Sequence, residues 1–289
     1  NGVLLAQVAP NGGIISGKSS VVQFDAWNWE DAVIEYDQGI HINWPSPYTY
    51  GRWWLGEDRG LKANNNYGKQ IKGLKDFFDR SKANMSIKKS MNLKSMAMRP
   101  VFEGVTTVFL YADDEKEIVD GVTFLKGYGI NKIVIVGATE SKNQLNFIKE
   151  NNIPVVVKQP YRFPQSTDSD PMETFEIAKK MLDHGILVSI DPTGTASARV
   201  SIRNLPFYAG SFSSFGIDKE IALSLITLNP AKILGIDKEF GTLELGKSAT
   251  LFVSSGDALD IISNDVTHAF ISGRGLSLET HQTRLWRRY

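Results

Sequence analysis

The sequence predicts an α/β protein, with a parallel sheet covered by helices and a small antiparallel element at the end of the chain. In the middle of the chain, short runs of β-branched and apolar residues alternate with helical patterns. These runs are TTVFLYA (106–112), KIVIVGA (132–138), IPVVVKQ (153–159) and GILVSID (185–191). Recurrence of strand and helix about every 25 residues is typical of βαβ units, whose parallel sheet is buried on both faces.

Residues 240–276 predict the second element. FGTLELGKSATLFVSSGD (240–257) alternates apolar and polar residues, and THAFISGRGL (267–276) has the composition of a strand pair around a Ser-Gly turn. Period-two alternation is typical of antiparallel strands with one buried face. We therefore expect an α/β body over residues 1–238 and a β element with a C-terminal tail over residues 239–289.

The connecting segments fit this plan. Helices are expected over Asp114–Leu125, Ser141–Glu150 and Met172–His184. Asp114 with Glu117 three residues later has the spacing of a capping box, which accounts for the acidic run DDEKE without a catalytic role. Near the N-terminus, strands over 2–10 and 19–25 are joined by NGGIISGK, which matches neither phosphate-binding glycine spacing and predicts a tight connection.

Composition excludes several classes of protein. The 289 residues are 42% hydrophobic and 22% charged, as in a soluble globular protein. Thirty-two basic residues balance thirty-two acidic ones, which gives no support for a nucleic-acid or membrane partner. There are no cysteines, so disulfides and thiolate metal sites are excluded, and the compartment, cytoplasmic or periplasmic and secreted, stays open.

Residues 224–260 carry a recognisable pattern, T-x-N-P-A-x-x-L-G followed by G-x-L-x-x-G-K-x-A-x-L. This segment resembles the closing segment of the amidohydrolase superfamily, where the last barrel helix leads into a small β-sandwich. Upstream, VAPNGGIISGKSSVVQFDAWNWEDAVI and RNLPFYAGSFSSFGI resemble its imidazolonepropionase-like branch. The matching positions are Thr227, Asn229, Pro230, Ala231, Leu234, Gly235, Gly241, Leu243, Gly246, Lys247, Ala249 and Leu251.

The resemblance implies a (β/α)8 TIM-like barrel with one or two divalent metals, such as zinc, at the carboxyl ends of its strands. Such a metal activates water to hydrolyse C–N bonds other than peptide bonds, in cyclic amides or dipeptide-like compounds. The implied ligands are a His-x-His pair on the first strand and a lysine or glutamate on a middle strand. One histidine on each of the next two strands and an aspartate on the eighth complete the set.

Against this pattern, the chain begins at what resembles the second barrel strand, so we expect a barrel that is incomplete at the N-terminus. Tyr111 and Gly137 occupy the positions where the two single histidines are expected. Weak candidate ligands are His41, in a His-x-Asn pair with Asn43, and Asp191 near the position of the eighth-strand aspartate. We therefore expect this chain to bind no catalytic metal of its own.

Three functions remain open. The chain is either a C–N hydrolase completed by other residues, or a degenerate metal-free domain that acts as a structural or ligand-binding partner. The third is metal-free hydrolysis, for which Asp113 and Asp191 are the candidate catalytic acids. Tyr111, Lys158 and Arg203 are candidate substrate-binding residues, since each lies near a predicted strand end or in the following loop. An upstream segment, a partner chain or a second copy of the chain is the expected macromolecular partner.

Overall fold

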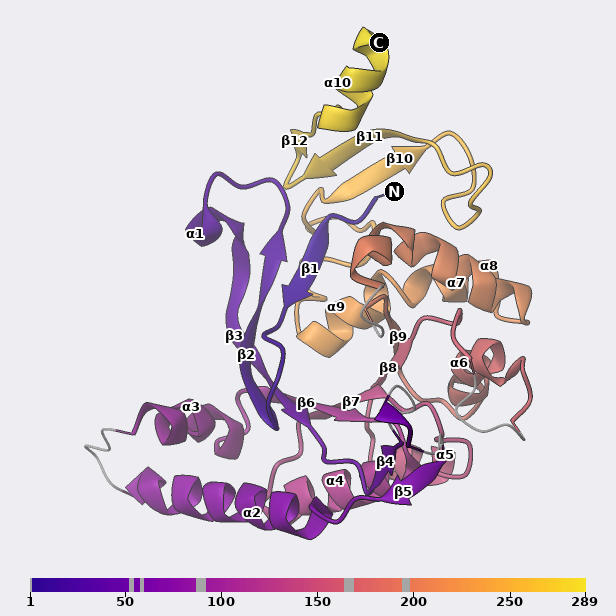
Figure 1. Cartoon of the computed structure of the whole chain (residues 1–289). Helices are drawn as coiled ribbons and strands as arrows, with labels where there is room; N and C mark the ends of the chain where they lie inside the picture. Colours follow the sequence, from indigo (N-terminus) through magenta and orange to yellow (C-terminus); the bar gives the residue numbers. More distant parts are fainter. Residues whose placement is uncertain (1, 52–54, 58–59, 87–91, 164–168, 194–197) are drawn as a thin grey trace. The chain divides into compact units, whose positions relative to one another are not determined.

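A computed structural model describes residues 2–51, 55–57, 60–86, 92–163, 169–193 and 198–289 (Figure 1). The chain divides into two compact units. The first unit comprises Asn1–Val8, Val21–Tyr36 and Val157–Tyr289, and the second comprises Ala9–Ser20 and Asp37–Val156. In the described ranges, no helix combines the length and hydrophobicity needed to cross a lipid bilayer.

The strands form the α/β arrangement that the sequence predicts. Within the described residues, seven strands hydrogen-bond in the order β1-β2-β3-β6-β7-β8-β9. Strand β3 (Val33–Asn43) pairs in parallel with β6 (Thr107–Ala112), and β6 pairs in parallel with β7 (Ile133–Gly137). The predicted α/β class is therefore confirmed, and the sheet is consistent with an incomplete (β/α)8 barrel.

The second unit contains the central strands and the helices next to them. Its elements besides β3, β6 and β7 are β4 (Tyr48–Tyr50), β5 (Leu61–Ala63), α2 (Tyr67–Ala83), the 3-10 helix η2 (Asn84–Ser86), α3 (Leu93–Phe102), α4 (Glu115–Gly127) and α5 (Leu145–Glu150). Helix α2 packs beside α4 through Phe78, which is fully buried and meets Phe124 and Tyr128 at ring-centroid distances of 5.0 and 5.1 Å (Figure 1). Burying one such ring contributes roughly 1.5–3 kcal/mol.

The acidic run after β6 is a helix cap, as predicted. The Asp114 carboxylate accepts from the backbone N–H of Lys116 at 2.8 Å, and the Glu117 carboxylate accepts from the N–H of Asp113 at 2.9 Å. Together with the reciprocal bonds between Asp114 and Glu117, these contacts form a complete capping box at the start of α4. The acidic run DDEKE thus forms the N-terminal cap and the first turn of helix α4.

The first unit contains the ends of the sheet and the C-terminal half of the chain. Its elements are β1 (Leu5–Val8), α1 (Trp29–Ala32), β8 (Val155–Lys158), α6 (Glu173–Asp183), β9 (Val188–Asp191), the 3-10 helix η3 (Ala198–Asn204), α7 (Leu205–Ser214), α8 (Lys219–Ser224) and α9 (Leu228–Leu234). Strand β2 (Ile15–Gln23), strand β3 and strand β8 each contribute residues to both units. A buried cluster of Val21, Ala231, Ile236 and Phe240 forms part of the core of this unit.

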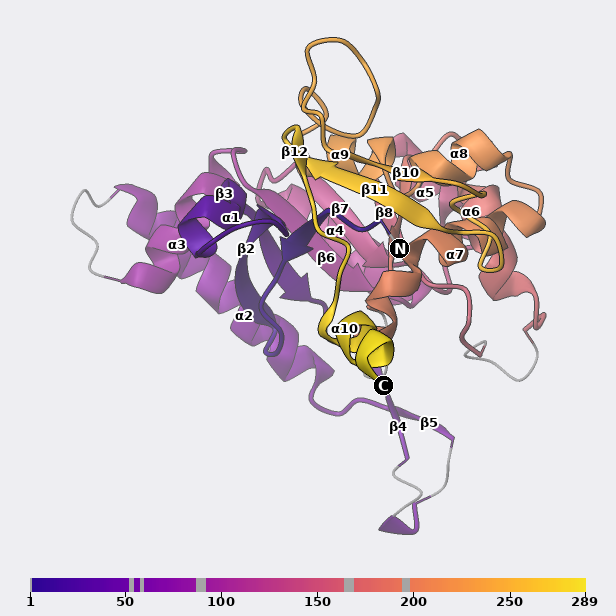
Figure 2. The ribbon, with the colours of Figure 1, turned by 90° about the horizontal axis from the view of Figure 1, so that it is seen from above.

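The chain ends in an antiparallel sheet and a helix. Strands β10 (Leu251–Ser254), β11 (Val266–Ile271) and β12 (Arg274–Gly275) form a three-stranded sheet, followed by α10 (His281–Arg288) (Figure 2). The predicted Ser-Gly turn is present, and both Ser272 and Gly273 have positive φ angles, 50° and 79°. Two successive positive φ angles are typical of the tight turns that join antiparallel strands.

Two predicted boundaries are wrong. Residues 240–250 contain no strand, because Gly241 and Gly246 adopt positive φ and because the Lys247 ammonium bonds the Asp237 carbonyl and the Thr242 hydroxyl, which folds the segment into turns. Near the N-terminus, β2 begins at Ile15, so half of the expected glycine-rich connection is strand. The expected domain division after residue 238 stays a prediction.

Candidate functional site

Tyr111 and His41 meet at the carboxyl ends of two neighbouring strands in the second unit. Tyr111 lies opposite Asn43 on β3, and its hydroxyl oxygen lies 3.1 Å from Nδ1 of His41. The imidazole is 1% exposed and stacks on Phe109 with a centroid distance of 4.9 Å. Among the described residues, Nε2 of His41 has no hydrogen-bond partner. The phenol therefore occupies one imidazole nitrogen, and the other is buried.

Burial fixes the charge of this histidine. It lowers the pKa of His41 from 6.5 to about 4, because a charged imidazolium loses its hydration in the interior. His41 is therefore neutral at pH 7. Its expected companion Asn43 points its amide elsewhere and donates to the Gly13 carbonyl at 2.7 Å and to the Ser16 hydroxyl at 2.9 Å. The His-x-Asn pair thus does not present two ligands to one point.

The backbone conformation and the surroundings of Gly137, at the end of β7, both disfavour a side chain at this position. Gly137 has a φ of +111°, in the region that favours glycine, and a Cβ at this position would lie 2.5 Å from Oδ1 of Asp113. That carboxylate oxygen accepts a hydrogen bond of 2.5 Å from the Thr139 hydroxyl. Position 137 therefore has neither the conformation nor the room for a histidine side chain.

The remaining predicted residues lie in the first unit. Asp191 ends β9, and its Oδ1 accepts from the backbone N–H and the hydroxyl of Thr193 at 2.7 and 2.6 Å. Lys158 ends the neighbouring strand β8, and Arg203 is an exposed residue of η3. Asp191 and Lys158 thus end neighbouring strands, whereas Asp113, Tyr111 and His41 belong to the second unit. Joint action of Asp113 and Asp191 stays a prediction.

The other three histidines have structural or surface positions. His184 caps the end of α6, where its Nδ1 lies 2.7 Å from the Lys180 carbonyl oxygen. His268 lies on β11 and His281 begins α10, and both are exposed. None of the three adds a ligand to the strand ends of its own unit.

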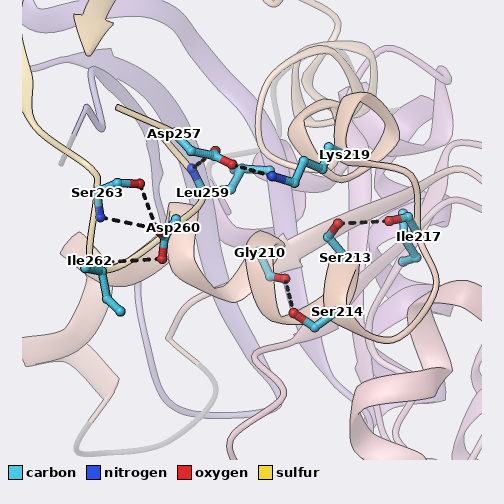
Figure 3. A network of polar contacts seen from close by, with 10 residues as sticks. All are labelled: Gly210, Ser213, Ser214, Ile217, Lys219, Asp257, Leu259, Asp260, Ile262 and Ser263. Carbon is cyan, nitrogen blue, oxygen red and sulfur yellow. Dashed lines mark hydrogen bonds and ion pairs between the residues drawn. The ribbon is translucent and has the colours of Figure 1, made fainter. Parts of the chain in front are cut away.

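A cavity in the first unit is a second candidate site, which the sequence analysis does not predict. Its volume is 1070 Å³. Four parts of the chain line it: the residues that follow β8, helix α7 with part of η3, Lys219 at the start of α8, and the loop 257–261. Figure 3 shows the ion pair between Asp257 of this loop and Lys219 at the start of α8, and the hydrogen bonds within the loop. Its walls come from residues far apart in the sequence, so no local motif could have revealed it.

The sequence of this chain is similar to that of a known protein family. The sequence model of the amidohydrolase family matches residues 115–275. This match covers more than half of the chain. The chain belongs to the amidohydrolase family. The predicted family resemblance is thereby confirmed, whereas no curated protein sequence matches the chain.

The chain is similar to several solved structures. An amidohydrolase from Thermotoga maritima MSB8 superposes with a TM-score of 0.78 at 22% identity, covering 96% of this chain and 72% of that one. An uncharacterized protein gives a TM-score of 0.50 at 14% identity, covering 84% of this chain and 56% of its own. A zinc-bound adenosine deaminase from Xanthomonas campestris gives 0.44 at 17% identity, covering 65% and 53%. The first of these likenesses confirms the fold, an incomplete TIM barrel with a C-terminal antiparallel element.

Members of the amidohydrolase family usually bind a divalent metal, so the side chains present here can be tested against that group. A catalytic zinc site needs three protein ligands around one point. In the described ranges of this chain, no three histidine, cysteine, aspartate or glutamate side chains are grouped to hold an ion. At the strand ends of the second unit, the possible donors are Nε2 of His41 and an Asp113 carboxylate already bonded by Thr139. The described donor set does not fit a catalytic metal.

Proposed function

We propose that this amidohydrolase-family chain is a ligand-binding domain that does not assemble a metal centre from its described residues. The observation that carries the proposal is the backbone conformation of Gly137 and the lack of room for a side chain there. At a position where the family resemblance implies a ligand, the backbone has a φ of +111° and the space for a side chain is taken by Asp113. A side chain at this position would carry backbone strain of about 1–3 kcal/mol and would have to displace the Asp113 carboxylate.

The second support comes from the neighbouring strand end. A metal-dependent hydrolase needs its ligands pre-positioned, with a coordination site open for water. Here the hydroxyl of Tyr111 is directed at Nδ1 of His41, and the imidazole is stacked on Phe109. Tyr111 thus bonds one nitrogen of the imidazole, and the ring packs on Phe109 as in a structural core. This arrangement favours ligand binding over metal-activated hydrolysis as the function of the chain.

A second candidate function is hydrolysis of non-peptide C–N bonds, in cyclic amides or dipeptide-like compounds. The family match over residues 115–275 favours it. The ligands would then have to come from a partner chain, another segment or residues outside the described ranges. This candidate therefore requires a partner in the active assembly, whereas the binding proposal does not.

Elemental analysis separates the two candidates. The protein is purified without chelator, its zinc, manganese and iron contents are measured, and the mass of every chain in the sample is recorded. We expect metal far below one ion per chain and no hydrolysis of N-acetyl amino acid amides. Stoichiometric metal, with hydrolysis that EDTA abolishes, would overturn the proposal. Metal found only when an additional chain is present would support the second candidate.

A further inference from the structure

The cavity in the first unit has walls that are held in place by specific polar contacts. The Gln159 side chain, itself 5% exposed, accepts from the backbone N–H of Tyr161 at 2.6 Å and donates to its carbonyl at 3.0 Å. This clamp fixes the loop that leaves β8. The Tyr161 ring meets Phe175 edge-on at 5.5 Å and lies 6.0 Å from Tyr208. One wall of the cavity is therefore a rigid aromatic surface.

The tyrosine hydroxyl keeps hydrogen-bonding capacity for a ligand. Its oxygen lies 2.7 Å from Oγ of Ser211, and Ser211 uses its own proton to bond the Phe207 carbonyl at 2.8 Å. Since the serine proton is committed, the hydrogen between the two hydroxyls belongs to Tyr161. The phenolic oxygen can thus still accept a hydrogen bond from a ligand in the cavity.

The opposite wall is the loop 257–261, which is anchored to the helices. Lys219 binds the Asp257 carboxylate at 2.7 Å, and the other carboxylate oxygen accepts from the N–H of Leu259 at 2.9 Å (Figure 3). The loop lies so close to α7 that a Cβ on Gly210 would be 2.2 Å from the Leu259 carbonyl oxygen. Only glycine permits this approach, which places Leu259 in the cavity wall.

The cavity combines an apolar rim with one unused amide. Phe163, Val200 and Ile261 line it and are 94%, 78% and 69% exposed, an amount of exposed apolar surface that is typical of binding sites. Asn204 also lines it, and although it precedes α7, its side chain makes no capping bond. Among the described residues, no hydrogen bond involves its carboxamide. A carboxamide offers a donor and an acceptor side by side.

We propose that this cavity binds a neutral ligand with an apolar body and a carboxamide group, which pairs with Asn204 and the Tyr161 hydroxyl. The charges favour a neutral ligand, because the cavity is lined by two cationic side chains, Arg162 and Lys219, and two anionic ones, Asp257 and Asp260, and Lys219 forms an ion pair with Asp257. The volume of 1070 Å³ is ample for a ligand of the size of a capped amino acid. This inference rests on the binding role proposed above, and it assigns that role to residues outside the strand-end cluster of the second unit.

The probes are N-acetyl-L-phenylalaninamide and N-acetyl-L-phenylalanine, which share one skeleton and differ in charge. Saturation-transfer NMR and calorimetric titration should show binding of the amide and at least about fivefold weaker binding of the acid. Asn204→Leu should weaken amide binding about fivefold and remove the preference for it over the acid. Phe163→Ala should weaken both probes, whereas Leu245→Ala, a fully exposed leucine outside the cavity, should change neither.

Urea unfolding of each variant verifies that it is folded. No binding of either probe, equal binding of amide and acid, or unchanged affinity in both cavity variants would overturn the assignment. These binding results do not depend on the metal content, which tests the proposed function, so the two failures can be distinguished. Conversely, release of ammonia or acetate from the amide by metal-loaded protein would contradict the proposed function and leave the cavity assignment standing.

Discussion

Nδ1 of His41 lies 3.1 Å from the hydroxyl oxygen of Tyr111, across two paired strands of the amidohydrolase fold. The pair joins a neutral imidazole to a phenol at a strand end where the family resemblance implies a metal ligand. Since one nitrogen of His41 bonds the phenol and the other is buried, the pair acts as a part of the core. We therefore expect the free energy of unfolding to depend on the protonation of His41.

Stability should fall as the pH is lowered from 6.5 towards 4. The pKa of His41 is about 4 in the folded protein, against an ordinary value of 6.5, so between these values the unfolded chain binds a proton that the folded chain does not. The stabilisation is complete above pH 6.5 and is lost as the pH falls, by up to about 3 kcal/mol at pH 4. Urea unfolding at pH 7 and pH 5 measures the loss.

The variant His41→Gln removes the titrating group and should reduce the change in unfolding free energy between pH 7 and pH 5. His268→Gln, which alters an exposed histidine, should keep the pH dependence of the unaltered protein. The same pH dependence in all three proteins would show that His41 is not the group responsible.

Gly137 should not tolerate any side chain. Gly137→Ala places a Cβ 2.5 Å from Oδ1 of Asp113 at a φ of +111°, and we expect a loss of stability of at least roughly 1–3 kcal/mol. Gly73→Ala is the matched control, since Gly73 occupies an exposed position of helix α2 with no atom near its Cβ position. That change should stabilise the protein by roughly 0.5–1 kcal/mol. Thermal unfolding of both variants measures the two opposite shifts, and a neutral Gly137→Ala would contradict the closed strand end.

Much of the fold could be predicted from the sequence, because its signals are local. The strands β6 and β7 appear as unbroken apolar runs, since each is buried on both faces. The cap of α4 appears as a spacing of three residues between two acids. Residues 240–250 were misassigned because their alternation arises from turns at Gly241 and Gly246, and alternation alone does not distinguish a strand from a series of turns.

The candidate sites could be predicted only in part. The strand pattern predicts that Tyr111 and Gly137 end neighbouring strands. The family resemblance indicates that both stand where histidine ligands are expected. The closure of Gly137 by Asp113 depends on a backbone angle that no residue pattern specifies. The cavity depends on the approach of Gly210 to Leu259, two residues 49 positions apart, and such contacts are set by tertiary packing.

The capping box of α4 should contribute measurably to stability. Asp114→Ala removes the acceptor for the N–H of Lys116, and we expect a loss of about 1 kcal/mol. Asp114→Asn keeps an acceptor oxygen at the same place, so it should recover most of that loss. The free energy of unfolding in urea at pH 7 compares the two variants. Equal losses in both would mean that the charge of Asp114, rather than its hydrogen bond, stabilises the helix.

Asn229, within the family motif T-x-N-P-A, should be a structural residue. Its side-chain amide is 7% exposed and donates to the carbonyl oxygen of Val188 on β9 at 2.8 Å. Asn229→Ala leaves that carbonyl buried without this donor, which should cost roughly 1–3 kcal/mol. Asn151→Ala is the matched control, because the Asn151 amide also bonds a carbonyl, that of Phe147, at 2.8 Å but is only half-buried. Water can replace that donor, so the control should lose clearly less free energy of unfolding in urea. If the two variants lose the same amount, burial of the Val188 carbonyl is not what this position of the motif serves.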